Sequence, residues 1–124
     1  MKPTIYPTLK EALYFHDLLL QRFGGRPGVL DLGLLESALT RPPSGYYGTV
    51  SEQAAALMQS LAINHPFVDG NRRIAVALTA VFLKLNGLNL TVKARVGVRF
   101  IEEELISKRA SLETITGWIE KHAG

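Results

Sequence analysis

The chain contains no cysteine, which excludes a disulfide framework and any metal site built from thiolates. No apolar run reaches the roughly 18 residues that a membrane-spanning helix needs. Residues 1–9 lack the apolar centre of a secretion signal, so we expect no such signal. Together these absences favour a cytoplasmic protein that does not associate with membranes.

Charge of either sign is scattered along the chain. The net charge is +3 and the isoelectric point is about 9.4, and a basic chain raises the alternative of nucleic-acid binding. Lys93, Arg95 and Arg99 form one local basic group, but the glutamates 102–104 follow at once. We therefore interpret this stretch as a mixed, solvated helix face, which argues against direct binding of nucleic acid.

Apolar residues make up 47% of the 124 residues, which suits one packed domain over residues 1–124. Helical spacing of apolar residues recurs almost throughout, so the sequence predicts an all-α fold of about six helices. Asp31 and Ser111 are expected to cap two of them. The first expected helix starts after Thr8 and ends before Gly24. Further helices are expected over about residues 31–41, 49–64, 74–85, 95–108 and 111–122, and residues 88–92 are expected to form an extended connector.

Two capping boxes are predicted, Thr8-x-x-Glu11 and Thr49-x-x-Glu52. Alanines concentrate on the helices before and after residues 65–73, where small side chains let helices approach closely. The alanines are residues 54, 55, 56, 62, 75, 77 and 80. We therefore expect these two helices to form a tight central pair.

Residues 65–73, His-Pro-Phe-Val-Asp-Gly-Asn-Arg-Arg, bring the most reactive side chains together on one loop before a helix. The free N–H groups and the dipole of a helix N-terminus favour an anion. Arginines beside them favour phosphate. Each residue type alone is more often structural, but simple loop formation does not need this ordered combination.

The chemistry of the loop suggests a role for each group. The imidazole of His65 can accept a proton from a hydroxyl group, and Asp69 suits Mg²⁺, which usually binds one or two carboxylates plus phosphate oxygens. Gly70 permits a tight turn and a close approach to a ligand. Asn71 can cap the following helix or donate to a phosphate oxygen.

Arg72 and Arg73 can neutralise charge that develops during phosphoryl or nucleotidyl transfer. Among the other residues, Phe67 is expected to anchor the loop in the core, and His16 to have a packing or surface role. Tyr46 and Tyr47 are expected either to line the substrate cleft or to pack under a loop. A salt bridge, a cap or a target contact would each account for Arg26 and Asp31.

The loop resembles the signature of the Fic/Doc superfamily, His-x-Phe-x-Asp/Glu-Gly/Ala-Asn-x-Arg. The resemblance covers roughly residues 8–122, because residues 23–42 look like the N-terminal half of Doc toxins and 82–87 like the end of their motif helix. It implies a compact helical bundle with the motif loop at the N-terminus of a central helix. It also implies the toxin of a type II toxin–antitoxin pair.

Doc-type members transfer the γ-phosphoryl group of ATP to a threonine of elongation factor Tu, which stops translation. The resemblance therefore implies ATP and Mg²⁺, with His65, Asp69 and Arg73 catalytic, Asp69 at the metal, and Gly70, Asn71, Arg72 and Arg73 at the phosphates. Related Fic proteins transfer AMP to a protein hydroxyl group. A non-catalytic nucleotide-binding or interaction module is a more distant alternative.

Two positions help to choose between kinase and AMP transferase. AMP-transferring relatives usually carry glycine where this chain has Arg72, and a second arginine where it has Val76. Doc-type sequences carry a basic and an apolar residue there, so both positions favour the Doc type. Arg72 stands where lysine is commoner, and the two are not interchangeable at phosphate sites.

Some Fic proteins inhibit themselves with a segment that contains Glu followed by Gly or Asn. No glutamate of this chain precedes either residue. We therefore expect inhibition by a separate, Phd-like antitoxin whose disordered tail folds over the toxin cleft.

Overall fold

The computed structural model describes residues 2–124, and this part of the chain is a bundle of six α-helices with two short helical segments of other types. The all-α prediction is therefore confirmed. The elements are α1 (Leu9–Phe23), α2 (Leu32–Thr40), η1 (Pro42–Ser44), α3 (Val50–Asn64), α4 (Asn71–Leu85), α5 (Ala94–Phe100), η2 (Ile101–Ser107) and α6 (Leu112–His122).

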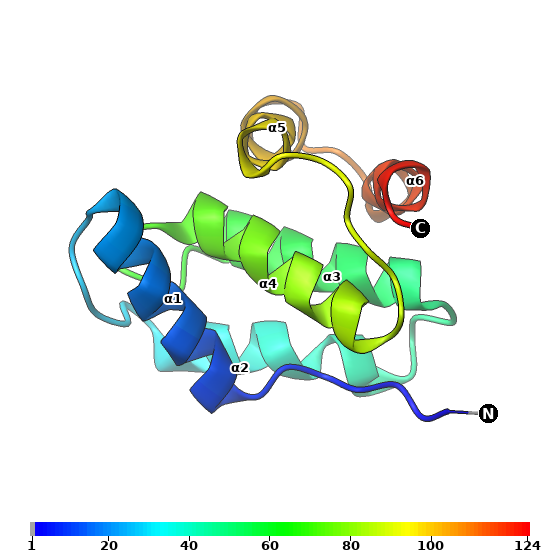
Figure 1. Cartoon of the computed structure of the whole chain (residues 1–124), viewed down its shortest axis with the longest axis horizontal. Helices are drawn as coiled ribbons and strands as arrows, with labels where there is room; N and C mark the ends of the chain where they lie inside the picture. Colours follow the sequence, from blue (N-terminus) through cyan, green and yellow to red (C-terminus); the bar gives the residue numbers. More distant parts are fainter. Residues whose placement is uncertain (1) are drawn as a thin grey trace.

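Helices α3 and α4 lie side by side in the middle of the bundle (Figure 1). Helices α1 and α2 cover one side of this pair, and α5 and α6 lie on the opposite side. Helix α1 packs on α4 and α2 packs on α3, while α6 packs on α3 and α5 packs on α4. Within residues 2–124, no helix is both long enough and apolar enough to cross a bilayer.

The close approach of α3 and α4 follows from their small side chains. Ala54, Ala55 and Ala62 on α3 and Ala75 on α4 are fully buried, which confirms the predicted tight pair. Larger residues of the same helices fill the rest of the core, namely Leu57, Met58, Leu61, Ile74, Leu78, Phe82 and Leu83. The pair is a rigid base for the loop that joins its two helices.

The helix starts largely follow the sequence. Thr8 and Glu11 form a full capping box, and Asp31 and Ser111 cap α2 and α6 as predicted. The second capping box is only half correct. The Thr49 hydroxyl accepts the N–H of Glu52 at 3.1 Å, but the Glu52 carboxylate accepts the Thr49 hydroxyl, also at 3.1 Å, and not the Thr49 N–H.

The predicted helix over about residues 95–108 is confirmed, but its second half is not α-helical. Helix α5 ends at Phe100, and the chain continues as the π-helical segment η2. Ile101 and Leu105 of this segment are buried in the core, while Glu104 pairs with Lys108 at 3.0 Å outside it. The connector over residues 88–92 is extended as expected, and Leu90 bridges to Ala123.

Candidate active site

The motif loop, residues 65–70, joins the two central helices. His65 ends α3 in the left-handed conformation, with φ 49° and ψ 61°, which is uncommon for a residue other than glycine. Its side chain is exposed, as are those of Asp69, Arg72 and Arg73, whereas Pro66, Phe67 and Asn71 are buried. The loop thus presents its reactive groups to solvent and holds its remaining residues in the core.

Phe67 anchors the loop as predicted, and His16 of α1 supports it from below. Phe67 is 1% exposed and His16 is 2% exposed, and their rings stack at a centroid distance of 3.7 Å. His16 Nε2 also lies 2.7 Å from the carbonyl oxygen of Asp69. The packing role expected for His16 is confirmed. Its place beneath the motif depends on a contact between distant parts of the chain.

Asn71 braces the loop with both ends of its side-chain amide. Its Oδ1 accepts the N–H of Phe67 at 2.9 Å, and its Nδ2 donates to the Phe67 carbonyl oxygen at 2.9 Å. The capping role considered for Asn71 is wrong, because Gly70, with φ 77°, occupies the cap position of α4. The predicted phosphate contact of Asn71 would fall to its backbone N–H, since the side chain is already engaged.

A second loop, residues 24–31, holds the motif loop from the side. Leu30 and Asp31 donate their N–H groups to the Pro66 carbonyl oxygen at 2.8 and 3.0 Å. Val68 donates its N–H to the Gly28 carbonyl oxygen at 3.0 Å. Residues 24–31 therefore pair antiparallel with the motif loop.

The Asp69 carboxylate is fixed by backbone donors from both loops. Oδ2 accepts the N–H of Arg26 at 3.2 Å, and Oδ1 accepts the N–H of Gly70 at 2.9 Å. A Cβ on Gly25, where φ is 120°, would lie 3.1 Å from Oδ2, so this approach requires glycine. Arg26 thus contributes its backbone rather than the salt bridge considered from the sequence.

These contacts lower the pKa of Asp69. The N–H of Arg26 contributes most, the N–H of Gly70 comes next, and the charges of Arg26 and Arg73 add to the effect. The carboxylate is therefore ionised at neutral pH, which is the form that binds a metal ion. A single exposed carboxylate suits Mg²⁺ shared with nucleotide phosphates, and residues 2–124 contain no cluster of three metal-binding side chains.

A titration of the Asp69 carboxyl group tests this geometry. A group whose pKa is lowered by folding stabilises the fold above its unfolded pKa, and this contribution is lost as the pH falls through the folded pKa. We expect the side-chain carboxyl ¹³C resonance of Asp69 to titrate below the ordinary value of 3.8 in the folded chain. The same resonance in the urea-unfolded chain is the control, and equal midpoints would contradict the two backbone contacts.

The two motif arginines point to different neighbours. Arg72 Nε lies 3.7 Å from Glu102 Oε1, in a pair whose side chains are both about half exposed and which therefore contributes little stability. The Arg73 guanidinium lies over the Phe23 ring, 4.5 Å from its centroid. Phe23 is 49% exposed, so the contact places an aromatic face beside the motif. Nothing in the sequence pointed to it.

A groove begins at Arg73 and runs along α4, and we call it the α4 groove. Its volume is about 480 Å³, which lies within the usual range for small-molecule sites. Most of its lining is apolar, and Arg95, Arg99 and Glu102 stand among the charged residues that line it. The stretch interpreted as a solvated face therefore also faces this groove. The apolar lining comprises Leu19, Phe23, Val76, Ala77, Ala80, Leu90, Val92, Ala94 and Val98.

Val76 is held by the helix on the far side of the groove. It is 5% exposed, and a Cβ on Gly97 of α5 would lie 2.8 Å from Val76 Cγ1. A β-carbon at position 97 has no room against Val76, so the close packing of α5 on α4 requires glycine at this position. Tyr46 is exposed and Tyr47 accepts a hydrogen bond from Arg41, and neither tyrosine lines the α4 groove.

The comparison with known families agrees with this geometry. The sequence profile of the Fic/DOC family matches residues 6–83, which contain both loops and the central helix pair. The chain belongs to the Fic/Doc family. The resemblance inferred from the motif is thereby confirmed, and the matched region ends within α4, before the connector and α5.

Two relatives within the family carry the Doc name. The "Toxin Doc" of Mycolicibacterium smegmatis is 48% identical over 73 residues, which are 55% of this chain and 56% of that protein. The "Protein kinase doc" of Escherichia phage P1 is 31% identical over 85 residues, which are 65% of this chain and 68% of that protein. The match to the mycobacterial protein thus spans just over half of its length.

Proposed function

We propose that this member of the Fic/Doc family is the toxin of a type II toxin–antitoxin pair and acts as a protein kinase. It transfers the γ-phosphoryl group of ATP to a Ser or Thr hydroxyl of a translation factor, for which elongation factor Tu is the first candidate. The packing of Val76 against Gly97 is the observation that carries the choice of reaction. It leaves Arg72 and Arg73 as the basic residues of the motif and an apolar residue at position 76, as in the Doc pattern.

In the proposed reaction, His65 accepts the proton of the target hydroxyl. The hydroxyl oxygen forms a bond to the γ-phosphorus, the bond from phosphorus to the β,γ-bridging oxygen breaks, and ADP leaves. The exposed side chain of His65 at the end of α3 is open to an incoming protein. Asp69 would hold Mg²⁺, which supplies positive charge against the phosphate oxygens.

The N-terminus of α4 supplies donors for the phosphates. The backbone N–H groups of residues 71–73 donate to no acceptor within residues 2–124. They belong to the free first turn of a helix, beside two cationic side chains. Because Asn71 and His16 hold this turn and its loop in place, the donors need little reorganisation when a polyphosphate binds.

Arg73 is the cation that we expect nucleotide binding to need most. Arg73→Ala should lower the affinity for Mg·ATP at least about tenfold, because a charge-assisted contact to phosphate is lost. Isothermal titration calorimetry with ATP measures the change. The control is Arg95→Ala, which removes an equal charge from the same groove but from α5 and not from the motif. Equal affinities of the Arg73→Ala variant and the unmodified chain would contradict the assignment.

The reaction type is tested with ATP labelled in parallel at the γ- and the α-phosphate. Purified chain, magnesium, elongation factor Tu and cell lysate are incubated with each. Protein labelled only from the γ position supports the kinase, whereas label from the α position means AMP transfer. Binding of ATP without transfer to any protein would identify a non-catalytic module.

The α4 groove suits the antitoxin. Its mostly apolar lining matches the apolar face of a helix that folds on binding. Its three arginines, residues 73, 95 and 99, outnumber its one acidic residue, Glu102, and favour a helix that also carries acidic residues. A segment bound there would lie against Arg73. The antitoxin would then compete with ATP, and a lower ATP affinity of the co-purified complex tests this arrangement.

A further inference from the structure

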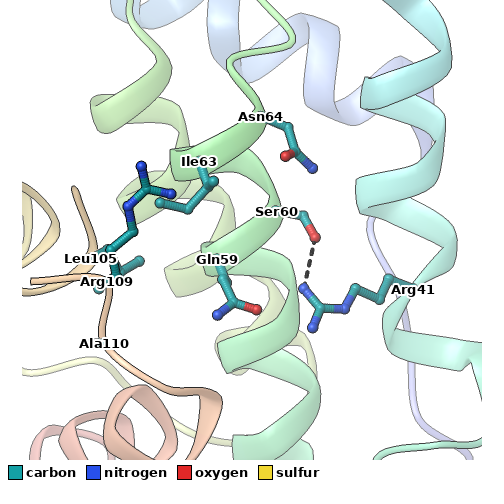
Figure 2. A pocket seen from close by; sticks show the side chains of 8 residues that line it. All are labelled: Arg41, Gln59, Ser60, Ile63, Asn64, Leu105, Arg109 and Ala110. Atoms are coloured by element: carbon teal, nitrogen blue, oxygen red, sulfur yellow. Dashed lines mark hydrogen bonds between the residues drawn. The ribbon is translucent and has the colours of Figure 1, made fainter.

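A second cavity is lined by α3 and contains no residue of α4, and we call it the α3 cavity. It has a volume of about 240 Å³ and is lined by α3, η2 and the end of α2. Figure 2 shows Arg41 on one side of α3 and Arg109 on the other, with Gln59, Ser60 and Asn64 between them. The proposed kinase reaction uses none of these side chains.

Arg41 is a fixed cation without a counter-charge. Its Nε donates to the Tyr47 hydroxyl at 2.7 Å, and one Nη donates to Ser60 Oγ at 3.0 Å and to the Ala56 carbonyl oxygen at 3.3 Å. Its Cζ also lies 5.4 Å from the centre of the Tyr47 ring. The second Nη makes no hydrogen bond within residues 2–124, so a half-buried, preorganised donor remains free.

Arg109 supplies the second cation. Its backbone is left-handed, with φ 55°, in the turn that follows η2, where the Ala110 N–H donates to the Glu104 carbonyl oxygen at 2.8 Å. Glycine would adopt this conformation without strain, whereas arginine adopts it with backbone strain. The fold therefore gains nothing from arginine here, and the side chain lines the α3 cavity.

No acidic side chain neutralises the cavity. Its lining contains no aspartate or glutamate, and neither arginine makes an ion pair within residues 2–124. Arg109 is exposed, but Arg41 is partly buried, and a partly buried charge is normally paired because removing it from water is costly. Two unpaired guanidinium groups on one cavity, one of them held rigidly, indicate an anionic partner from outside the chain.

The other residues that line the cavity indicate which kind of molecule provides the negative charge. Gln59 and Asn64 have carboxamides that both donate and accept, which is what a peptide backbone needs. Ile63, Leu105 and Ala110 add apolar surface for a side-chain stem. The cavity reaches the C-terminus of α3, which disfavours negative charge, and it disfavours a doubly charged phosphate more than a single carboxylate. We propose that the α3 cavity binds an acidic polypeptide segment, with its carboxylates on Arg41 and Arg109.

The cavity follows the last turns of α3 up to Asn64, the residue before His65. A protein docked there is therefore held at the same end of α3 as the exposed imidazole. Its binding depends on neither ATP nor transfer, so it is measured separately from the proposed kinase activity.

The test is a titration of the ¹⁵N-labelled chain with a blocked glutamate-rich peptide, without nucleotide. We expect the amides of Ser60, Asn64 and Ala110 to shift, and the same peptide with glutamine at every glutamate to leave them unchanged. Arg109→Gln should weaken binding about tenfold or more, because it removes one charged contact from an exposed side chain that the fold does not need. Lys10→Gln, an equal charge change on α1, should leave the affinity unchanged.

Three results would overturn the proposal. The first is the absence of binding by the acidic peptide. The second is binding that shifts only residues of the α4 groove or that Arg109→Gln does not weaken. The third is a shift of the same amides by inorganic phosphate but not by the peptide, which would make the cavity a site for free phosphate.

Discussion

His65→Ala is expected to reduce transfer from ATP by about 10²- to 10⁴-fold, the usual contribution of a general base. The thermal unfolding midpoint should change little, because the His65 side chain is exposed and makes no hydrogen bond or ring contact within residues 2–124. Single-turnover transfer of the γ-phosphoryl group and circular dichroism provide the two measurements. Induced expression should arrest growth with the unmodified chain and not with the variant.

A second variant distinguishes the loss of the base from a change in backbone conformation at residue 65. His65 occupies a left-handed position, which asparagine tolerates better than most residues. His65→Asn therefore keeps the end of α3 and still removes the base, and it should be as inactive as His65→Ala. Transfer at the unmodified rate in both variants would eliminate His65 as the proton acceptor. Growth without any defect, under full expression of the unmodified chain, would contradict the toxin assignment.

Asn71→Ala is expected to damage both stability and activity. The substitution leaves the buried N–H and carbonyl groups of Phe67 without their partners, and each such group costs about 1–3 kcal/mol. Denaturant unfolding measures the loss of stability. Because the freed loop no longer holds Asp69 and the first turn of α4, we expect transfer to fall even where the chain remains folded. Hydrogen exchange of the Phe67 amide should accelerate.

The matched control is Asn89→Ala in the connector. Asn89 is exposed and its side chain makes no hydrogen bond within residues 2–124, so this variant should unfold and transfer like the unmodified chain. Asn71→Asp isolates the donor, because an aspartate can accept the Phe67 N–H but cannot donate to the Phe67 carbonyl oxygen when it is ionised. Equal stability of Asn71→Ala and Asn89→Ala would show that the two bonds do not hold the loop.

Local sequence patterns correctly predicted the helix starts and ends that depend on interactions between nearby residues. Thr8 and Glu11 predicted the start of α1, Asp31 and Ser111 predicted two further caps, and Asn86-Gly87 marked the end of α4. These features depend on groups three or four residues apart. The π-helical turn of η2 was missed because it depends on the core that receives Ile101 and Leu105, and no local signal in the segment encodes that core.

The sequence by itself determined the all-α fold, the central alanine-rich pair and the family of the chain, because a short ordered motif and its helix patterns carry all three. Only the tertiary structure decided which residues hold the motif in place. His16 beneath Phe67, the Arg26 N–H on Asp69 and Gly97 against Val76 each join segments far apart in the chain. Contacts between distant segments arise from how the helices pack, and residue spacing along the chain does not specify them.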